Sequence, residues 1–433
     1  MSADTSGSPK AAVENVATDG KRQAAMPFIL VTVLIDMMSI GLIVPVLPYL
    51  VGTFTSSPTE QTFWFGAIAF TFGAANFFAS PILGALSDRY GRRPILLLGF
   101  SGLALSFIGT GLATAIWMLI AVRLFSGAMQ SNVAVANAYV ADITAPEDRA
   151  RRFGQLGAMF GVGFILGPVM GGLLGAISVH LPFFVAGALA IVNWLYGWFV
   201  LPESLPVERR RRFEWKRANP LSAMLGLARL SAVGPLVAVG ALASLAQFVL
   251  HNSIVLYTHF KFGWGPAQVG WLLFTVGVTS AFVQGVLLKH LLKRFTPQRL
   301  ASFGLVTGSL TFLGFGLAPQ GWMMFLIVIA GTLLGGGAQA AMTSIISNAV
   351  DERTQGQTMG SVASLNSLMA VAAPMVSATL LGIVSHRPQG DWLIGMPFYF
   401  CALAQAIGAV IAIRFFIKRR AMMAAPASAT APA

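Results

Sequence analysis

The sequence predicts an all-α membrane protein whose twelve transmembrane helices form two six-helix, pseudo-symmetric halves. Of the 433 residues, 56% are hydrophobic and only 10% are charged, whereas soluble proteins average about 25% charged residues. The apolar residues gather in runs that are long enough to cross a hydrocarbon layer of about 30 Å. This composition excludes a soluble enzyme, a disordered chain and a collagen-like chain.

The apolar runs define the predicted spans and the segments between them. We expect spans near residues 26–50, 62–86, 94–114, 116–143, 153–177, 181–201, 233–257, 267–292, 299–318, 321–349, 357–384 and 394–417. The first six spans make an N-terminal half, 26–201, and the last six make a C-terminal half, 233–417. Outside the halves lie a polar tail at 1–25, which we expect to be disordered, an Arg-rich cytoplasmic linker at 202–232 and a second tail at 418–433.

Basic residues fall mainly on one side of this arrangement. The net charge is +13, and the bases concentrate in loops that follow even-numbered spans, whereas the opposite loops hold only Lys261 and Arg387. By the positive-inside rule we expect both termini of this multi-pass membrane protein in the cytoplasm. Bases spread between spans do not form the single basic face of a nucleic-acid binder. We therefore expect a lipid environment and no nucleic acid.

The two halves resemble one another in sequence. The junction after the fourth span reads PEDRARRFGQLG and the junction after the tenth reads VDERTQGQTMG, so Arg149 pairs with Arg353 and Pro168 pairs with Pro374. A repeat of about half the chain is typical of secondary transporters, which bind substrate near the midplane between the halves. Two unrelated helix bundles are the alternative. We expect the chain to act as a monomer.

The loop after the second span combines glycines, an acid and bases at fixed spacing: Gly84, Asp88, Arg89, Gly91, Arg92 and Arg93. Gly84 allows close helix approach. Asp88 can accept hydrogen bonds from nearby Arg side chains or from amides at a facing helix N-terminus, and such contacts can be broken and remade. A simple positive-inside turn would account for the bases alone.

The fifth span carries a second pattern, Gly-x8-Gly-x3-Gly-Pro-x2-Gly-Gly, formed by Gly154, Gly163, Gly167, Pro168, Gly171 and Gly172. Most of these glycines share one side of a helix, where a neighbouring backbone can pack tightly. Pro168 removes one backbone donor and is expected to bend the helix. Close packing alone would also explain a glycine-rich span.

Asp36 lies deep in the first span, ten residues after Met26. A charge near the bilayer centre costs on the order of 3 kcal/mol, so an acid there is by default a functional residue. A titratable carboxyl suits a proton carrier, and Arg123 in the fourth span is the expected counter-charge. The alternative is a structural Asp36 paired to a polar neighbour. Pro45 and Pro48 are expected to bend the outer half of the same span.

These motifs together resemble the drug/proton antiporter branch of the major facilitator superfamily, and in particular the bacterial tetracycline/proton antiporters. The resemblance is carried by Asp36 with the GLIVPVLP stretch, by SDRYGRRPILLL, by Arg123-Leu124 with Ser126-Gly127, and by the fifth-span glycines. It implies that Asp36 is a functional membrane acid and that Arg123 supports proton coupling. It also implies that the loop at Asp88 stabilises a cytoplasmic gate and that the fifth-span pattern marks an exporter.

The resemblance also indicates substrate contacts. Asn76 stands where the family usually has Gln in the second span, and Gln284 matches a family Gln in the eighth. Gln130 and Asn132 replace the small residues that the family prefers in the fourth span. All four amides are candidates for substrate binding.

The sequence departs from the family pattern in the ninth span. The family antiporters carry an Asp there, but the matching stretch 304–311 contains no acid. Asp36 must then carry the proton alone, or His251 in the seventh span must help, because imidazole titrates near neutral pH. A hydrogen-bonded packing role for His251 is the alternative.

The function expected from these observations is proton-coupled export of a small amphipathic drug, with tetracycline-type compounds as the first candidates. A proton-linked sugar or metabolite exporter and a non-transporting membrane sensor with the same fold are the alternatives. We expect no enzymatic activity, no metal and no cofactor, because the sequence offers no nucleophile–base pair and no metal cluster. The single Cys401 also excludes a cysteine-based metal site. No Walker sequence is present, so we expect no ATP-driven step in this chain.

Overall fold

The structure, a computed structural model, describes residues 9–130, 132–211, 213, 234–348 and 352–424. Its α-helices, in chain order, are α1 (Pro9–Ile43), α2 (Leu47–Gly52), α3 (Pro58–Tyr90), α4 (Arg92–Gly111), α5 (Ile116–Met129), α6 (Asn132–Ile143), α7 (Arg149–Ile177), α8 (Leu181–Val200), α10 (Gly234–Phe262), α11 (Pro266–Phe282), α12 (Leu288–Arg294), α13 (Pro297–Leu317), α14 (Met323–Gly335), α15 (Ala338–Asn348), α16 (Glu352–Val384) and α17 (Met396–Ala424). Together they supply 12 segments long and apolar enough to cross a membrane, which confirms the predicted all-α class and span count.

The first span differs from prediction at its start and agrees at its end. Helix α1 begins at Pro9, so the expectation of a disordered tail is wrong from that residue onward. The Ala-rich sequence before Met26 has a good intrinsic helix propensity, which explains the extension. At the other end α1 stops at Ile43 and α2 starts at Leu47. The break surrounds Pro45, as predicted, because proline disfavours a helical residue before it.

Two spans predicted to be continuous are broken. In the fourth span α5 ends at Met129, and Gln130 adopts extended backbone angles of −87° and 92°. In the tenth span Gly336 and Gly337 separate α14 from α15. A Cβ at Gly336 would lie 2.6 Å from Cγ1 of Val283, so this glycine allows close packing against the eighth span. The matched positions of the two breaks fit the internal repeat.

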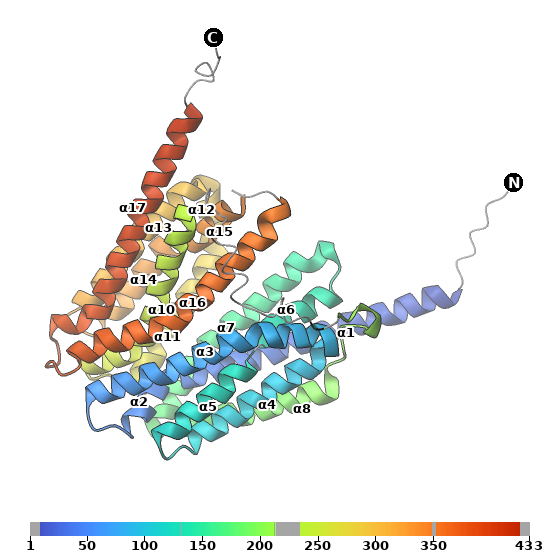
Figure 1. Cartoon of the computed structure of the whole chain (residues 1–433), viewed down its shortest axis with the longest axis horizontal. Helices are drawn as coiled ribbons and strands as arrows, with labels where there is room; N and C mark the ends of the chain where they lie inside the picture. The colour runs from blue at the N-terminus through green and yellow to red at the C-terminus, as the bar shows by residue number, and fades with distance from the viewer. Residues whose placement is uncertain (1–8, 131, 212, 214–233, 349–351, 425–433) are drawn as a thin grey trace, which may run out of the picture.

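The halves meet at one end of the molecule and separate at the other. Helix α7 packs on α11, and α3 packs on α16. A Cβ added at Gly172 of α7 would lie 3.0 Å from Cα of Gly270 in α11, so the backbones are in contact there. Figure 1 shows the contact near the α2–α3 and α16–α17 connections and the divergence toward α6 and α15. The space between the halves therefore narrows toward one end.

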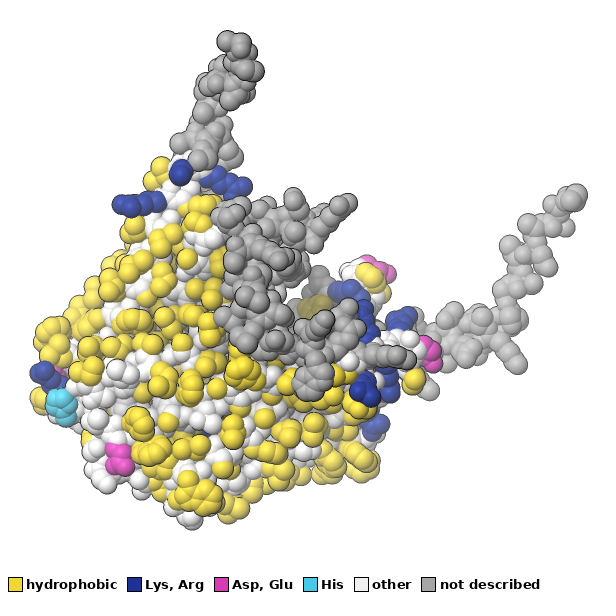
Figure 2. Space-filling model, in the orientation of Figure 1, with side chains coloured by type: hydrophobic (Ala, Val, Ile, Leu, Met, Phe, Trp, Pro, Cys, Tyr) yellow, Lys and Arg dark blue, Asp and Glu magenta, His cyan; other side chains and the backbone are white. Residues whose placement is uncertain are grey.

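The surface fits a lipid-embedded bundle. Large apolar side chains such as Trp117, Phe199 and Leu310 are exposed on helix faces, where lipid tails would cover them. Figure 2 shows hydrophobic atoms over most of the visible face, while Lys and Arg gather mainly near the ends that lead to the two termini. Because a bilayer core offers no hydrogen-bond partners, closed helical segments with apolar exteriors are the structures that can span it.

The fifth-span glycines place α7 directly against α1. A Cβ at Gly163 would lie 2.6 Å from Cβ of Met37, and a Cβ at Gly167 would lie 2.8 Å from Cα of Gly41. Gly171 faces Leu42 even more closely. These contacts agree with the close packing predicted for the pattern. Gly154 differs, because a Cβ there would have nothing within 4 Å.

Candidate functional site

A cavity of about 1410 Å³ lies between the two halves. Its wall includes residues of α1, α3, α5 and α7 from the first half and of α10, α11 and α16 from the second. The lining is largely apolar, and seven phenylalanines contribute to it: Phe65, Phe72, Phe77, Phe107, Phe164, Phe248 and Phe315. Drug-sized ligands occupy pockets of about 300–1,000 Å³ with apolar walls and a few polar groups. The cavity can therefore admit a bulky amphipathic molecule.

Three of the four predicted substrate amides line this cavity. Asn76 donates from Nδ2 to the backbone oxygen of Gln130 at 2.5 Å, so α3 supplies a partner for a carbonyl freed by the break after α5. Gln284 lies in a single π-helical turn, Val283–Leu287, that interrupts the eighth span. Such turns often occur at functional sites. The π turn exposes Gln284 to the cavity.

The fourth predicted amide, Asn132, does not line the cavity. It is buried at the start of α6, where Nδ2 donates to Oδ1 of Asp36 at 3.2 Å. A substrate in the cavity cannot reach a side chain that is held inside the first half, so the prediction of a substrate contact is wrong in this conformation. Asn132 is instead the hydrogen-bond partner of the membrane acid.

Asp36 occupies a separate space of about 10 Å³ beside the cavity. Only 5% of the residue is exposed, and Thr32, Asn132 and Phe160 are among its neighbours there. A volume of about 10–15 Å³ is the least that holds one water, so this space has room for a single water molecule at most. The carboxyl is enclosed, whereas Ile40, one helical turn later on α1, faces the cavity.

Arg123 is not the partner of Asp36. The guanidinium lines the cavity, only 7% of the residue is exposed, and its nearest aromatic ring is Phe72 at 6.0 Å. No ion pair within 4.0 Å joins Arg123 to an acid in the described part of the chain, so the predicted counter-charge is wrong for this conformation. Asp36 instead accepts a hydrogen bond from Asn132, which begins α6, the second part of the broken fourth span.

His251 lines the cavity on α10, with its Nε2 atom 3.4 Å from Nε2 of Gln247. The residue is exposed, as is Gln247 one turn earlier. The contact with Gln247 fits the alternative of a hydrogen-bonded packing histidine, although the ring also borders the cavity. The ring can meet either solvent or a ligand in the cavity.

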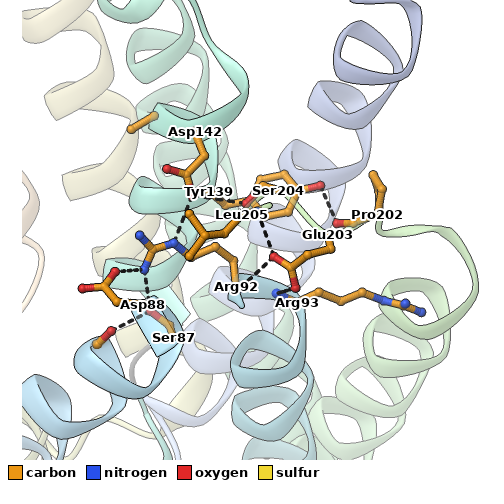
Figure 3. A network of polar contacts seen from close by, with 12 residues as sticks. Ser87, Asp88, Arg92, Arg93, Tyr139, Asp142, Pro202, Glu203, Ser204 and Leu205 are labelled. Carbon is orange, nitrogen blue, oxygen red and sulfur yellow. Dashed lines mark hydrogen bonds and ion pairs between the residues drawn. The ribbon is translucent and has the colours of Figure 1, made fainter. Parts of the chain in front are cut away.

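The predicted gate loop forms a dense polar network within the first half (Figure 3). Arg92 on α4 contacts Oδ1 of Asp88 on α3 at 2.6 Å and Oδ2 of Asp142 on α6 at 3.0 Å. Gly91 has a φ of 108°, which favours glycine, and it joins the two helices without a longer loop. The ion pairs therefore tie three helices of one half together rather than tying the halves to each other.

A segment after α8 completes this network, and the sequence reasoning missed it. Glu203 accepts from the backbone N–H groups of Arg92 at 2.8 Å and Arg93 at 3.3 Å, which places a carboxylate at the α4 N-terminus. This is the favourable position for a negative charge on the helix dipole. Ser204 donates to Oδ2 of Asp142 at 3.3 Å (Figure 3). The available signal was Glu203 itself, the first of three acids in the Arg-rich linker.

Gly84 does not make the expected close helix contact. A Cβ there would have nothing within 4 Å. The same holds for Gly154 in α7, which lines the cavity. Both positions lie toward the ends at which the halves diverge. With the halves apart, no described helix of the other half lies close enough to pack against these glycines.

Comparisons with known proteins assign the chain to a family. The sequence matches the profile of the Major Facilitator Superfamily over residues 29–374 and 236–432. The chain belongs to the major facilitator superfamily. It is 35% identical over 384 residues, 88% of this chain and 96% of the relative, to the tetracycline resistance protein, class C, of Escherichia coli. It is 34% identical to the class D protein of Salmonella ordonez over 92% of this chain and 98% of that protein.

A solved structure supports the fold independently. The nucleoside transporter NupG matches with a TM-score of 0.74 at 14% identity, covering 90% of this chain and 99% of that one. At such identity the likeness concerns the fold alone. Membership of the major facilitator superfamily makes the chain a multi-pass membrane transporter with a small-molecule substrate, rather than an enzyme.

Two contacts between the halves close the narrow end of this major facilitator fold. The Tyr49 hydroxyl donates to the backbone oxygen of Trp264 at 2.7 Å. The hydroxyls of Thr59 and Ser385 lie 2.9 Å apart. Neither pair was predicted, because contacts between distant loops leave no periodic pattern in the sequence.

Proposed function

We propose that this protein exports a small amphipathic drug, of the tetracycline type, in exchange for protons. The observation that carries the proposal is an aromatic cavity between the halves, with one enclosed acid, Asp36, a helical turn before the cavity-lining Ile40. The curated relatives are named for tetracycline resistance, which export would provide. Seven phenylalanines in the lining favour an amphipathic drug over a sugar, whose hydroxyls require a more polar wall.

The broken fourth span supplies a route for coupling. Gln130, at the end of α5, borders the cavity, and Asn132, at the start of α6, holds Asp36. A change in the charge of Asp36 alters its bond to Asn132, and that change lies two residues from a backbone carbonyl that accepts from Asn76. A proton on Asp36 would thereby bias the shape of the cavity wall. Asp36 and substrate need not share one space for this coupling.

The proposal includes an orientation. The Arg-rich ends and both termini are placed in the cytoplasm of a bacterium, with the protein in the inner membrane and active as a monomer without ATP. The structure would then be open toward the cytoplasm and closed by Tyr49 and Thr59 on the outer side. Reporter fusions at Ser2 and Ala433 test this: a reporter active only outside the cytoplasm at either end would reverse the orientation.

Drug susceptibility tests the export proposal. An efflux-deficient bacterial host expressing the chain is expected to grow at higher concentrations of tetracycline than the same host carrying the Asp36→Asn variant. Chloramphenicol and cationic dyes tested in parallel define the range of substrates. Equal growth of hosts that carry wild type and the empty vector, for every compound, would reject drug export. Ligand binding in detergent without any flux would instead support the membrane-sensor alternative.

The Asp88 carboxylate is expected to matter for transport and not for insertion. Asp88→Asn removes the ion pair to Arg92, leaving a weaker neutral contact at a position that is substantially solvent-exposed. An exposed ion pair contributes about 0.2–1 kcal/mol, so its loss weakens the junction of α3, α4 and α6 by up to about fivefold. We expect normal expression and reduced tetracycline flux in vesicles.

The matched control for Asp88 is Asp148→Asn. Asp148 is an exposed acid that precedes α7 and makes no side-chain cap hydrogen bond. This variant is expected to transport normally. Wild-type flux in Asp88→Asn would contradict a role in transport for this loop and would leave its bases as a positive-inside signal only.

A further inference from the structure

The charge distribution around the cavity is one-sided. Among the described residues that line it, Arg123 is the only Lys, Arg, Asp or Glu. The nearest membrane acid, Asp36, lies in a separate space and is engaged by Asn132. A ligand that enters the cavity therefore meets one fixed positive charge and no fixed negative charge among these lining residues.

The Arg123 guanidinium is buried without satisfying its donors. The residue is 7% exposed, and its Nε and Nη2 atoms have no hydrogen-bond partner. A guanidinium presents five N–H donors in a rigid fork that matches a carboxylate or another planar anion. Leaving a buried charge unpaired is strongly unfavourable. The residue borders the cavity, so its guanidinium is the positive charge that a ligand there meets.

The neighbours of Arg123 extend this feature into a subsite. Arg123 and Ser126 lie three residues apart on one face of α5, Gln130 directly follows that helix, and all three border the cavity. Phe72 and Asn76, one turn apart on α3, border it beside them, with Phe72 nearest to the guanidinium. The wall thus combines a planar cation, polar side chains and an aromatic ring.

We propose that Arg123 is the anion-binding group of the substrate site, and that the preferred substrates are amphipathic organic anions. A carboxylate or enolate would pair with the Arg123 guanidinium, while a planar apolar body contacts Phe72 and the phenylalanines of the opposite half. This assignment rests on the proposed function, because it specifies which small molecules the exporter takes. Arg123 is here a substrate-binding residue rather than the counter-ion of Asp36.

Equilibrium binding to two dyes of opposite charge tests the assignment. Fluorescein and rhodamine 123 share a xanthene body, but at pH 7.5 fluorescein is anionic and rhodamine 123 is cationic. Binding to the full-length protein in detergent, in chloride-free buffer and without a proton gradient, is measured by fluorescence anisotropy. Wild type is expected to bind fluorescein at least about tenfold more tightly than rhodamine 123, in line with a hydrogen bond to a charged group.

Three variants separate the charge from the fold. Arg123→Gln is expected to lose the preference for fluorescein by about tenfold or more. Arg123→Lys keeps the charge and is expected to retain part of the preference. Arg299→Gln, an exposed base at the start of α13, is the matched control and should bind both dyes as wild type does.

The outcomes also separate this inference from the proposed function. Tighter binding of rhodamine 123 to wild type, or an equal loss of both dyes in a folded Arg123→Gln protein, overturns the anion subsite. Where Arg123→Gln does not fold, wild type and Arg123→Lys replace it as the test. In that case, a preference for fluorescein in both wild type and Arg123→Lys supports the anion subsite, and no preference in wild type overturns the subsite. Selective fluorescein binding without any gradient-driven export would reject the exporter and leave the subsite standing.

Discussion

Replacement of Asp36 by asparagine is expected to abolish substrate accumulation driven by a pH gradient. The amide has nearly the same shape and can keep a hydrogen bond to Asn132, but it cannot take up or release a proton. No acid of the ninth-span stretch can substitute for Asp36, because residues 304–311 contain no carboxylate. The measurement is uptake of tetracycline into inverted membrane vesicles with an acidic interior.

Substrate binding and exchange distinguish a lost proton carrier from a lost fold. Asp36→Asn should still bind tetracycline and should still exchange labelled for unlabelled substrate, since neither process requires net proton movement. Asp36→Glu, which keeps a titratable group, is expected to recover part of the uptake. Full gradient-driven accumulation by Asp36→Asn would assign the proton to another group, and His251→Gln would be the next variant to measure.

Substitution of Gly167 is expected to cause a large loss of stability. A Cβ at this position would lie 2.7 Å from the backbone oxygen of Met38 and 2.8 Å from Cα of Gly41, so both obstacles are backbone atoms that cannot rotate away. Overpacking of this kind costs about 1–3 kcal/mol for small insertions. Gly167→Ala should therefore lower the melting temperature in detergent by several degrees, and Gly167→Val should prevent recovery of folded protein.

Gly154→Ala is the internal control for this packing account. Gly154 belongs to the same helix and to the same sequence pattern, yet a Cβ there would have nothing within 4 Å. Alanine in place of glycine favours a helix by up to about 1 kcal/mol, so this variant should be as stable as wild type or more stable. Equal melting temperatures for Gly167→Ala and Gly154→Ala would contradict the proposed contact between α1 and α7.

Much of the fold follows from properties that act locally along the sequence. Each span must be apolar over its full length to lie in lipid, so hydropathy locates all twelve. Pro45 interrupts the first span through its own ring and through the residue before it, which makes that break predictable. The fifth-span glycines likewise indicated a tightly packed face, although the sequence could not say that α1 packs on it.

The interruptions at Gln130 and Gln284 could not be predicted, because their causes are tertiary. Gln130 leaves the helix where Asn76, from a different span, satisfies its carbonyl. Gln284 occupies a π turn that no local breaker marks. The expected pairing of Asp36 with Arg123 failed for a related reason. Two buried charges suggested a pair, but the broken fourth span directs Asn132 toward Asp36 and leaves Arg123 facing the cavity.

The account depends most directly on proton-coupled movement of an amphipathic molecule through the central cavity. The decisive measurement is tetracycline uptake by purified wild-type protein in proteoliposomes, with an acidic interior imposed and then collapsed by nigericin. Proton-coupled export predicts accumulation above the external concentration while the gradient lasts and loss of that accumulation when nigericin is added. Uptake that never exceeds equilibration, or that is the same with and without the gradient, would contradict it.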